Sequence, residues 1–183
     1  IGGGQGGSGE KLYFYSGTVQ ANGGRLASGI GGSYKGRGSE IYIYGGTVSA
    51  QGGEGGAGIG GGCWKTEQDM NGINAAHDIY ISGGTVTAKG GYNGAGIGGG
   101  RDGSGCDISI TGGVVQAQGY FGAGIGGGMN GDSWNILIKD TTLTALAFPL
   151  YPSSDYTELS ASAVGRGSNR THYMSAMKNQ EDL

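Results

Sequence analysis

Apolar residues recur at every second position in several short stretches of this chain. Between residues 41 and 50, the apolar Ile41, Ile43 and Val48 alternate with side chains that would point the opposite way. Alternation over such short lengths is typical of a β-strand with one buried face. A third alternation follows in the phrase GAGIGGG at 56–62, where glycine takes the outward positions. The pattern predicts three short strands in succession, and no stretch carries a helical period or a helix-capping pattern.

The same unit returns along the chain, reading approximately I-Y-I-x-G-G-T-V-x-A before a glycine-rich phrase. Its copies start at Leu12, Ile41, Ile79, Ile108 and Ile136, at spacings of 29, 38, 29 and 28 residues. An insertion at 63–78 accounts for the long spacing. One such unit cannot bury its own apolar stripe, so repeats of this kind stack and share a core. We expect an all-β fold, a single-stranded parallel β-helix of about five to six coils, with about 28–29 residues and three short strands per coil.

Stacked coils place equivalent residues above one another at a strand spacing of about 4.8 Å. Three inner ladders are expected: Leu12, Ile41, Ile79, Ile108 and Ile136; then Val19, Val48, Val86, Val115 and Leu143; then Ile30, Ile59, Ile97, Ile125 and Val164. The right hand is the usual one for parallel crossovers. A β-roll or a stack of hairpins is the second choice of architecture.

Glycine supplies 47 of the 183 residues, and the phrase GAGIGGG occurs at 56–62, 94–100 and 122–128. Glycine turns corners with φ > 0 at no steric cost, which gives the phrase a structural role. An alternative is that a smooth glycine face lets a partner subunit or a flat ligand approach closely.

Composition narrows the function classes. Lysine and arginine number 11 and aspartate and glutamate 14, a net charge of −3, without the basic stripe of a nucleic-acid-binding protein. No apolar run approaches the roughly 20 residues of a membrane span. The chain opens inside a repeat, and we expect a fragment or a mature form. Residues 1–147 are expected to form the β-helix, and 148–183 a partial last coil followed by a C-terminal cap or a linker.

Tyrosines mark the outward face of the first strand. They form two rows, Tyr13, Tyr42 and Tyr80, and beside them Tyr15 and Tyr44. One interpretation is cross-strand stacking that stabilises the sheet. The other is a flat aromatic platform on which sugar rings lie, with the phenol hydroxyls as hydrogen-bond partners.

Threonines mark the outward face of the second strand. Rows of Thr-x-Thr resemble ice-binding surfaces, but only the pairs Thr85/Thr87 and Thr142/Thr144 are complete, and threonine is also an ordinary strand residue.

A few carboxylates in the corner loops are candidate calcium ligands. Asp102 and Asp107 flank a Gly-Ser-Gly-Cys loop, and Asp132, Asp69 and Asn71 lie in other loops. Calcium prefers six to eight oxygen ligands. Solvated turn residues are the alternative, since aspartate and asparagine are common in turns for backbone reasons. No other cofactor is expected.

Two cysteines, Cys63 and Cys106, fall near equivalent corners of neighbouring coils. A disulfide between them would pin the insertion against the next coil, if their α-carbons come within about 7 Å. Free thiols are the alternative. Cysteine–histidine catalysis is a weaker hypothesis, because His77 and His172 lie in an insertion and in the tail.

Catalysis has little support in the pattern. Parallel β-helices include polysaccharide lyases and hydrolases, whose sites need clustered carboxylates or a calcium site with a nearby base. Here no outward column holds two acids, and the basic residues are scattered among corner loops. We therefore predict no catalytic residues.

The G-G-T-V-x-A and G-A-G-I-G-G-G units resemble glycine-rich repeat regions of large surface or secreted proteins of Gram-positive and gut bacteria. The resemblance covers about residues 1–147, and the repeats are also loosely similar to those of autotransporter adhesins. It implies an extracellular or cell-surface module. With the tyrosine rows, it predicts a non-catalytic module that binds carbohydrate or adheres to a glycan or host ligand through Tyr13, Tyr15, Tyr42, Tyr44 and Tyr80. A purely structural stalk and a polysaccharide-active enzyme are the alternatives.

Overall fold

The computed structural model describes residues 1–64, 75–148 and 161–168, and in these residues every regular element is a β-strand. The strands form three parallel sheets of five strands each. The first sheet contains β1 (Gly9–Phe14), β4 (Gly38–Ile43), β7 (Ala76–Ile81), β10 (Gly105–Ile110) and β13 (Ser133–Ile138). The second contains β2 (Thr18–Asn22), β5 (Thr47–Gln51), β8 (Thr85–Lys89), β11 (Val114–Gly119) and β14 (Thr142–Ala147). The third contains β3 (Ile30–Gly31), β6 (Ile59–Gly60), β9 (Ile97–Gly98), β12 (Ile125–Gly126) and β15 (Val164–Gly165).

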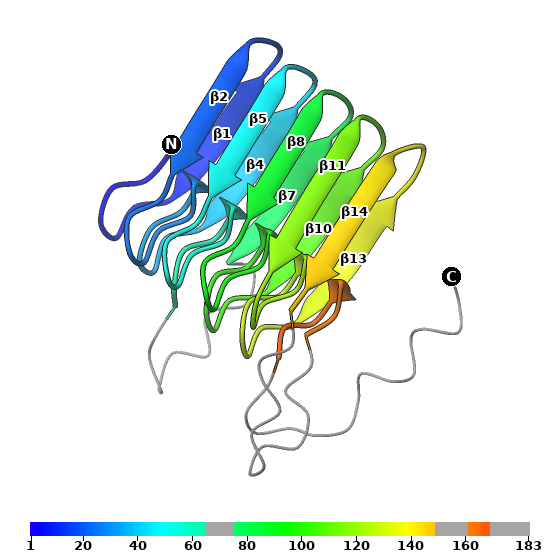
Figure 1. Cartoon of the computed structure of the whole chain (residues 1–183). Helices are drawn as coiled ribbons and strands as arrows, with labels where there is room; N and C mark the ends of the chain where they lie inside the picture. The colour runs from blue at the N-terminus through cyan, green and yellow to red at the C-terminus, as the bar shows by residue number, and fades with distance from the viewer. Residues whose placement is uncertain (65–74, 149–160, 169–183) are drawn as a thin grey trace.

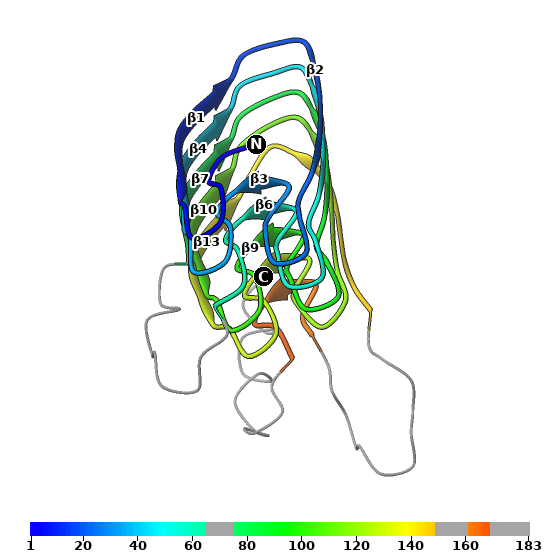
Figure 2. The same cartoon turned by 90° about the vertical axis from the view of Figure 1, so that its left-hand side faces the viewer.

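Each coil contributes one strand to each sheet, so the chain forms a parallel β-helix, as the repeat predicts. The first and second sheets lie face to face, with their strands side by side along the stack (Figure 1). Seen along the stack, β3, β6 and β9 lie between these two sheets (Figure 2). The described residues contain five strand triplets, at the lower end of the expected five to six coils. A further bridge joins Gly2 to Gly31.

The expected inner ladders are confirmed residue by residue. In the first sheet, Ile41 pairs with Leu12 and Ile79, and Ile108 pairs with Ile79 and Ile136. The valine ladder of the second sheet and the isoleucine ladder of the third are equally in register, including the final Ile125–Val164 pair. The central isoleucines are fully buried in one core shared by all three sheets. The predicted boundary at residue 147 and the cap beyond it stay predictions, since most of 148–183 lies outside the described residues.

The third sheet explains the repeated glycines. Gly60 has φ of 129°, a conformation that L side chains rarely adopt, and a Cβ there would lie 2.2 Å from the carbonyl oxygen of Gly98. Gly98 and Gly126 repeat this relationship with the next coil. The glycine is required because backbone meets backbone at every rung.

The alternative of a smooth, accessible glycine face is wrong. Every residue from Gly55 to Cys63 is buried. The two corner loops on either side of the third strand meet and hydrogen-bond, with Cys63 N donating to Leu26 O at 3.0 Å and Arg101 N to Gly55 O at 2.8 Å. In the three copies of GAGIGGG, the loops and the neighbouring strands therefore leave no glycine surface for a ligand.

A column of left-handed residues runs through the first sheet. Lys11, Glu40, Asp78, Asp107 and Asn135 have φ between 51° and 57°. The structure begins each first-sheet strand three residues before the repeat start identified in the sequence, and so includes these residues. The prediction that no outward column holds two acids is therefore wrong, because this column holds Glu40, Asp78 and Asp107. Aspartate and asparagine tolerate the left-handed conformation better than other non-glycine residues. They occupy three of the five positions, Asp78, Asp107 and Asn135.

Candidate functional site

The tyrosines of the first sheet form two stacked rows, which we call the tyrosine rows. Tyr42 lies between Tyr13 and Tyr80, with ring centroids 4.9 Å and 5.0 Å away and ring planes within 8° of parallel. In the second row, Tyr15 and Tyr44 stack at 5.1 Å. The rows contact each other through Tyr42 and Tyr44, whose centroids are 6.2 Å apart. The structure therefore brings all five predicted residues onto one face.

The rings are arranged differently from the flat platform that the sequence suggests. Each ring stacks on its neighbour in the next coil, so the ring faces inside a row cover one another. The inner Tyr42 is half-buried, whereas Tyr80 at the end of the row is 38% exposed. A sugar that packs on an aromatic ring needs an open face. Within a row, ring edges face solvent, and open faces occur only where a row ends.

The tyrosine hydroxyls lie close to acidic side chains. Tyr80 donates a hydrogen bond from its hydroxyl to Asp78 Oδ1 at 3.2 Å. Burial and then this hydrogen bond raise the pKa of Tyr80 above its ordinary value. Burial, followed by the charges of Tyr13, Glu40 and Asp78, raises the pKa of Tyr42. Both hydroxyls therefore stay protonated at neutral pH and are hydrogen-bond donors.

The column of left-handed residues in the first sheet lies beside the tyrosine rows. It contains the acidic side chains that raise the pKa values of Tyr42 and Tyr80, namely Glu40, Asp78 and Asp107. His77 Nδ1 lies 2.8 Å from Asp78 Oδ2. In the next coils, Asn135 Nδ2 donates to Asp107 Oδ1 at 2.5 Å. From the sequence we assigned His77 to an insertion, but it lies inside β7. The signal that would have placed it was the strict repeat, since it occupies the position of Ser39 in the previous coil.

The candidate calcium ligands are bound to separate protein partners. Asp102 Oδ2 lies 3.2 Å from Arg101 Nε, and its Oδ1 accepts a hydrogen bond from Asn130 at 2.7 Å. Asp132 forms an ion pair with Arg166. Among the described residues, no three histidine, cysteine or acidic side chains gather as a metal site would require. Asp69 and Asn71 lie outside those residues.

The predicted disulfide between Cys63 and Cys106 is not formed, and both residues are buried thiols. The reason is that they occupy different columns. Cys63 is equivalent to Arg101, because both backbone amides donate to the facing corner loop. Cys106 lies five residues further on, in β10, opposite Trp134. Burial, then the hydrogen bond and charge of Asp107, raise the pKa of Cys106 to about 12, which keeps the thiol protonated and poorly nucleophilic. His172 lies outside the described residues.

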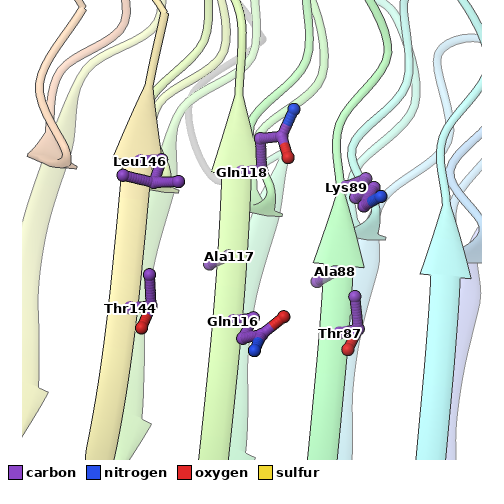
Figure 3. Close-up of a pocket in the computed structure, with 8 residues that line it drawn as sticks. All are labelled: Thr87, Ala88, Lys89, Gln116, Ala117, Gln118, Thr144 and Leu146. Carbon is purple, nitrogen blue, oxygen red and sulfur yellow. The ribbon is translucent and has the colours of Figure 1, made fainter.

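The outward face of the second sheet is flatter and less aromatic. Thr18, Thr47 and Thr85 are in register, but Val114 interrupts the row before Thr142. A shallow depression lies toward the C-terminal ends of β8, β11 and β14 (Figure 3). Its outward side chains are Thr87, Lys89, Gln116, Gln118, Thr144 and Leu146. It contains neither an acidic nor an aromatic side chain, which makes it a weaker candidate for sugar stacking than the first sheet.

The comparison with protein families agrees with the fold. A family model described as a beta helix repeat matches the chain at residues 15–34, 41–63, 79–101 and 108–129. No curated protein and no solved structure matches the chain. Among the described residues, no helix has the length and apolar character needed to cross a membrane. The chain therefore carries a parallel β-helix repeat region.

Proposed function

We propose that this β-helix repeat region is a non-catalytic binding module, displayed outside the cell or on a bacterial cell surface, that holds a carbohydrate at the tyrosine rows. The observation that carries the proposal is the gathering of five tyrosine rings on one face of the first sheet. Four of them, Tyr13, Tyr15, Tyr44 and Tyr80, are between 38% and 68% exposed. Exposed aromatic groups on this scale usually mark a contact surface.

The chemistry of this face suits a polyhydroxylated ligand. The Tyr42 hydroxyl is protonated at neutral pH and can donate, whereas the Tyr80 hydroxyl donates to Asp78 and can accept. The carboxylate of Asp107 is a further acceptor near Tyr80. Sugar hydroxyls both donate and accept hydrogen bonds, and their C–H faces pack on aromatic rings. No nucleic-acid partner is proposed, because the face is acidic.

Binding to a glycan array tests the proposal. We expect the wild-type chain to be retained on at least one glycan, and Tyr42→Ala with Tyr44→Ala to lose that retention while keeping the β-sheet circular dichroism spectrum. The matched control is Tyr92→Ala with Tyr120→Ala, which removes two exposed tyrosines from corner positions. Equal retention of both double variants would contradict the assignment to the tyrosine rows.

A structural stalk is the second candidate, and the ring geometry favours it over an enzyme. Stacking within the rows stabilises the sheet without any ligand. A stalk predicts no retention on any glycan and an elongated monomer in small-angle scattering. The polysaccharide-active enzyme predicts instead a pH-dependent turnover of polyuronides by the wild-type chain.

A further inference from the structure

The longer tyrosine row stops at β7, and the next position in the same column is Ser109. The α-carbon of Ser109 pairs with Tyr80 on one side and with Leu137 on the other. Its side chain faces outward, because it alternates with the buried Ile108 and Ile110. A small side chain thus stands between two large ones. We call the space outside it, between the Tyr80 ring and the Leu137 side chain, the Ser109 gap.

The gap has the thickness of one ring. Tyr13, Tyr42 and Tyr80 show that each coil accommodates one ring at 4.9–5.0 Å from the next. The α-carbons of Tyr80 and Leu137 are two strand spacings apart, or about 9.6 Å. A single flat ring midway would therefore stack on Tyr80 and contact Leu137, which is 51% exposed.

The rim of the gap is polar and acidic. Asp107 lies two residues before Ser109 on the same strand. Its carboxylate adds to the raised pKa of Tyr80, after burial and the larger effects of Asp78 and Tyr42. The Asp107 carboxylate accepts hydrogen bonds from Asn135 and from the Cys106 thiol. Because two carboxylate oxygens can accept about four hydrogen bonds, Asp107 can accept a further one from a ligand. The Ser109 hydroxyl forms the floor. These groups suit a ring that carries hydroxyls and no negative charge.

We propose that the Ser109 gap binds one neutral pyranose ring of a glycan, stacked on the open face of Tyr80 and hydrogen-bonded to Asp107. This inference rests on the proposed carbohydrate-binding function and gives it one site and one ligand class. The ring completes the row in the place where a fourth tyrosine would lie. A uronate is rejected, because its carboxylate would meet Asp107 and Asp78.

Titration of the full chain with defined oligosaccharides tests the inference. The probes are cellohexaose, xylohexaose and chitohexaose as neutral ligands, and hexagalacturonate as the acidic one, followed by amide chemical shifts in NMR. We expect at least one neutral hexaose to shift the resonances of Tyr80, Ser109 and Asp107, and hexagalacturonate to leave them unchanged.

Filling the gap separates this inference from the proposed function. Ser109→Tyr extends the stacked row, and Ser109→Leu fills the same space without a planar ring. Both variants are expected to bind the neutral hexaose at least tenfold more weakly, while Thr87→Tyr, on the outward face of the second sheet, binds as the wild type does.

Each result has a defined meaning. If Ser109→Tyr and Ser109→Leu bind as tightly as the wild type, the Ser109 gap is not the binding site. The tyrosine rows then remain the proposed carbohydrate-binding site. If the wild type binds none of the neutral hexaoses, or binds hexagalacturonate more tightly, the inference is overturned, and the glycan array decides the proposed function separately.

Discussion

Tyr80 stacks on Tyr42 with ring centroids 5.0 Å apart and ring planes 8° apart, so the two residues cover each other's faces. Tyr42 makes the same kind of contact with Tyr13 and Tyr44 and has the most ring neighbours among the five tyrosines. The rows therefore contribute to stability whether or not a ligand binds, and their contribution is concentrated at Tyr42.

Replacing Tyr42 should cost more than replacing a tyrosine at the edge of the rows. Aromatic pairs contribute about 0.5–1.5 kcal/mol each beyond the burial of their area. We expect Tyr42→Ala to lower the free energy of unfolding by about 1–3 kcal/mol in urea denaturation. Tyr15→Ala removes a ring with one stacking partner and 68% exposure, and should cost less than 1 kcal/mol. Equal costs would show that stacking contributes little.

A methyl group on a third-sheet glycine should be strongly destabilising. In Gly98→Ala the new Cβ would lie 2.0 Å from the carbonyl oxygen of Gly126, at a φ of 130°. Several kcal/mol of lost stability, or no folded protein, is the expected result. Gly24→Ala is the control, because a Cβ there meets nothing within 4 Å and its φ is not positive. Thermal unfolding of both variants measures the difference, which should be absent if glycine serves only as a flexible linker.

Relief of the left-handed backbone should stabilise the fold. Glu40 has φ of 51°, and asparagine adopts this conformation more readily than glutamate. Glu40→Asn is expected to raise the free energy of unfolding by about 0.5–1 kcal/mol. The same change at Glu10, which lies in β1 outside the left-handed column, should have no stabilising effect. A loss of stability in Glu40→Asn would argue against strain at this position.

The Cys106 thiol should make stability depend on alkaline pH. Its folded pKa of about 12 lies above the ordinary cysteine value, so folding favours the protonated form. Its contribution is complete below about pH 8.5 and declines as pH rises toward 12, since the unfolded chain then releases the proton first. The stability of the wild type relative to Cys106→Ala should fall across pH 9–11. Urea unfolding at fixed pH values checks this, and a constant difference would contradict it.

The reactivity of Cys106 follows from the same burial. Iodoacetamide should label this residue slowly in the folded chain and readily after denaturation, as mass spectrometry of the peptide will show. Fast labelling in native buffer would mean that β10 opens locally.

The sequence carries enough information to predict the ladders, because the same apolar residues recur at nearly fixed spacing. One column is evident from residue identity and spacing alone, at Ile41, Ile79 and Ile108. Parallel stacking follows because the coils must share a core. The orientation of the tyrosine rings has no such signal, since alternation gives the face of a side chain and not its torsion angles.

Other features depend on contacts between segments that the repeat does not encode. The burial of the glycine face results from hydrogen bonds between facing corner loops, such as that from Cys63 to Leu26. The predicted cysteine pairing is wrong because the glycine-rich corner does not align by its letters. The hydrogen bonds make Cys63 equivalent to Arg101, whereas Cys106 lies five residues later, within β10. The left-handed column was detectable, because Asp78, Asp107 and Asn135 are residue types enriched in that conformation.

The matching register of every coil has a consequence for how such a molecule changes its length. The two edges of any inner coil present the same hydrogen-bonding pattern and the same apolar column. An in-frame duplication of one repeat in the gene therefore adds one complete coil, about 4.8 Å long, that packs as its neighbours do. Unequal recombination between near-identical repeats can therefore lengthen or shorten this rod while leaving its cross-section unchanged.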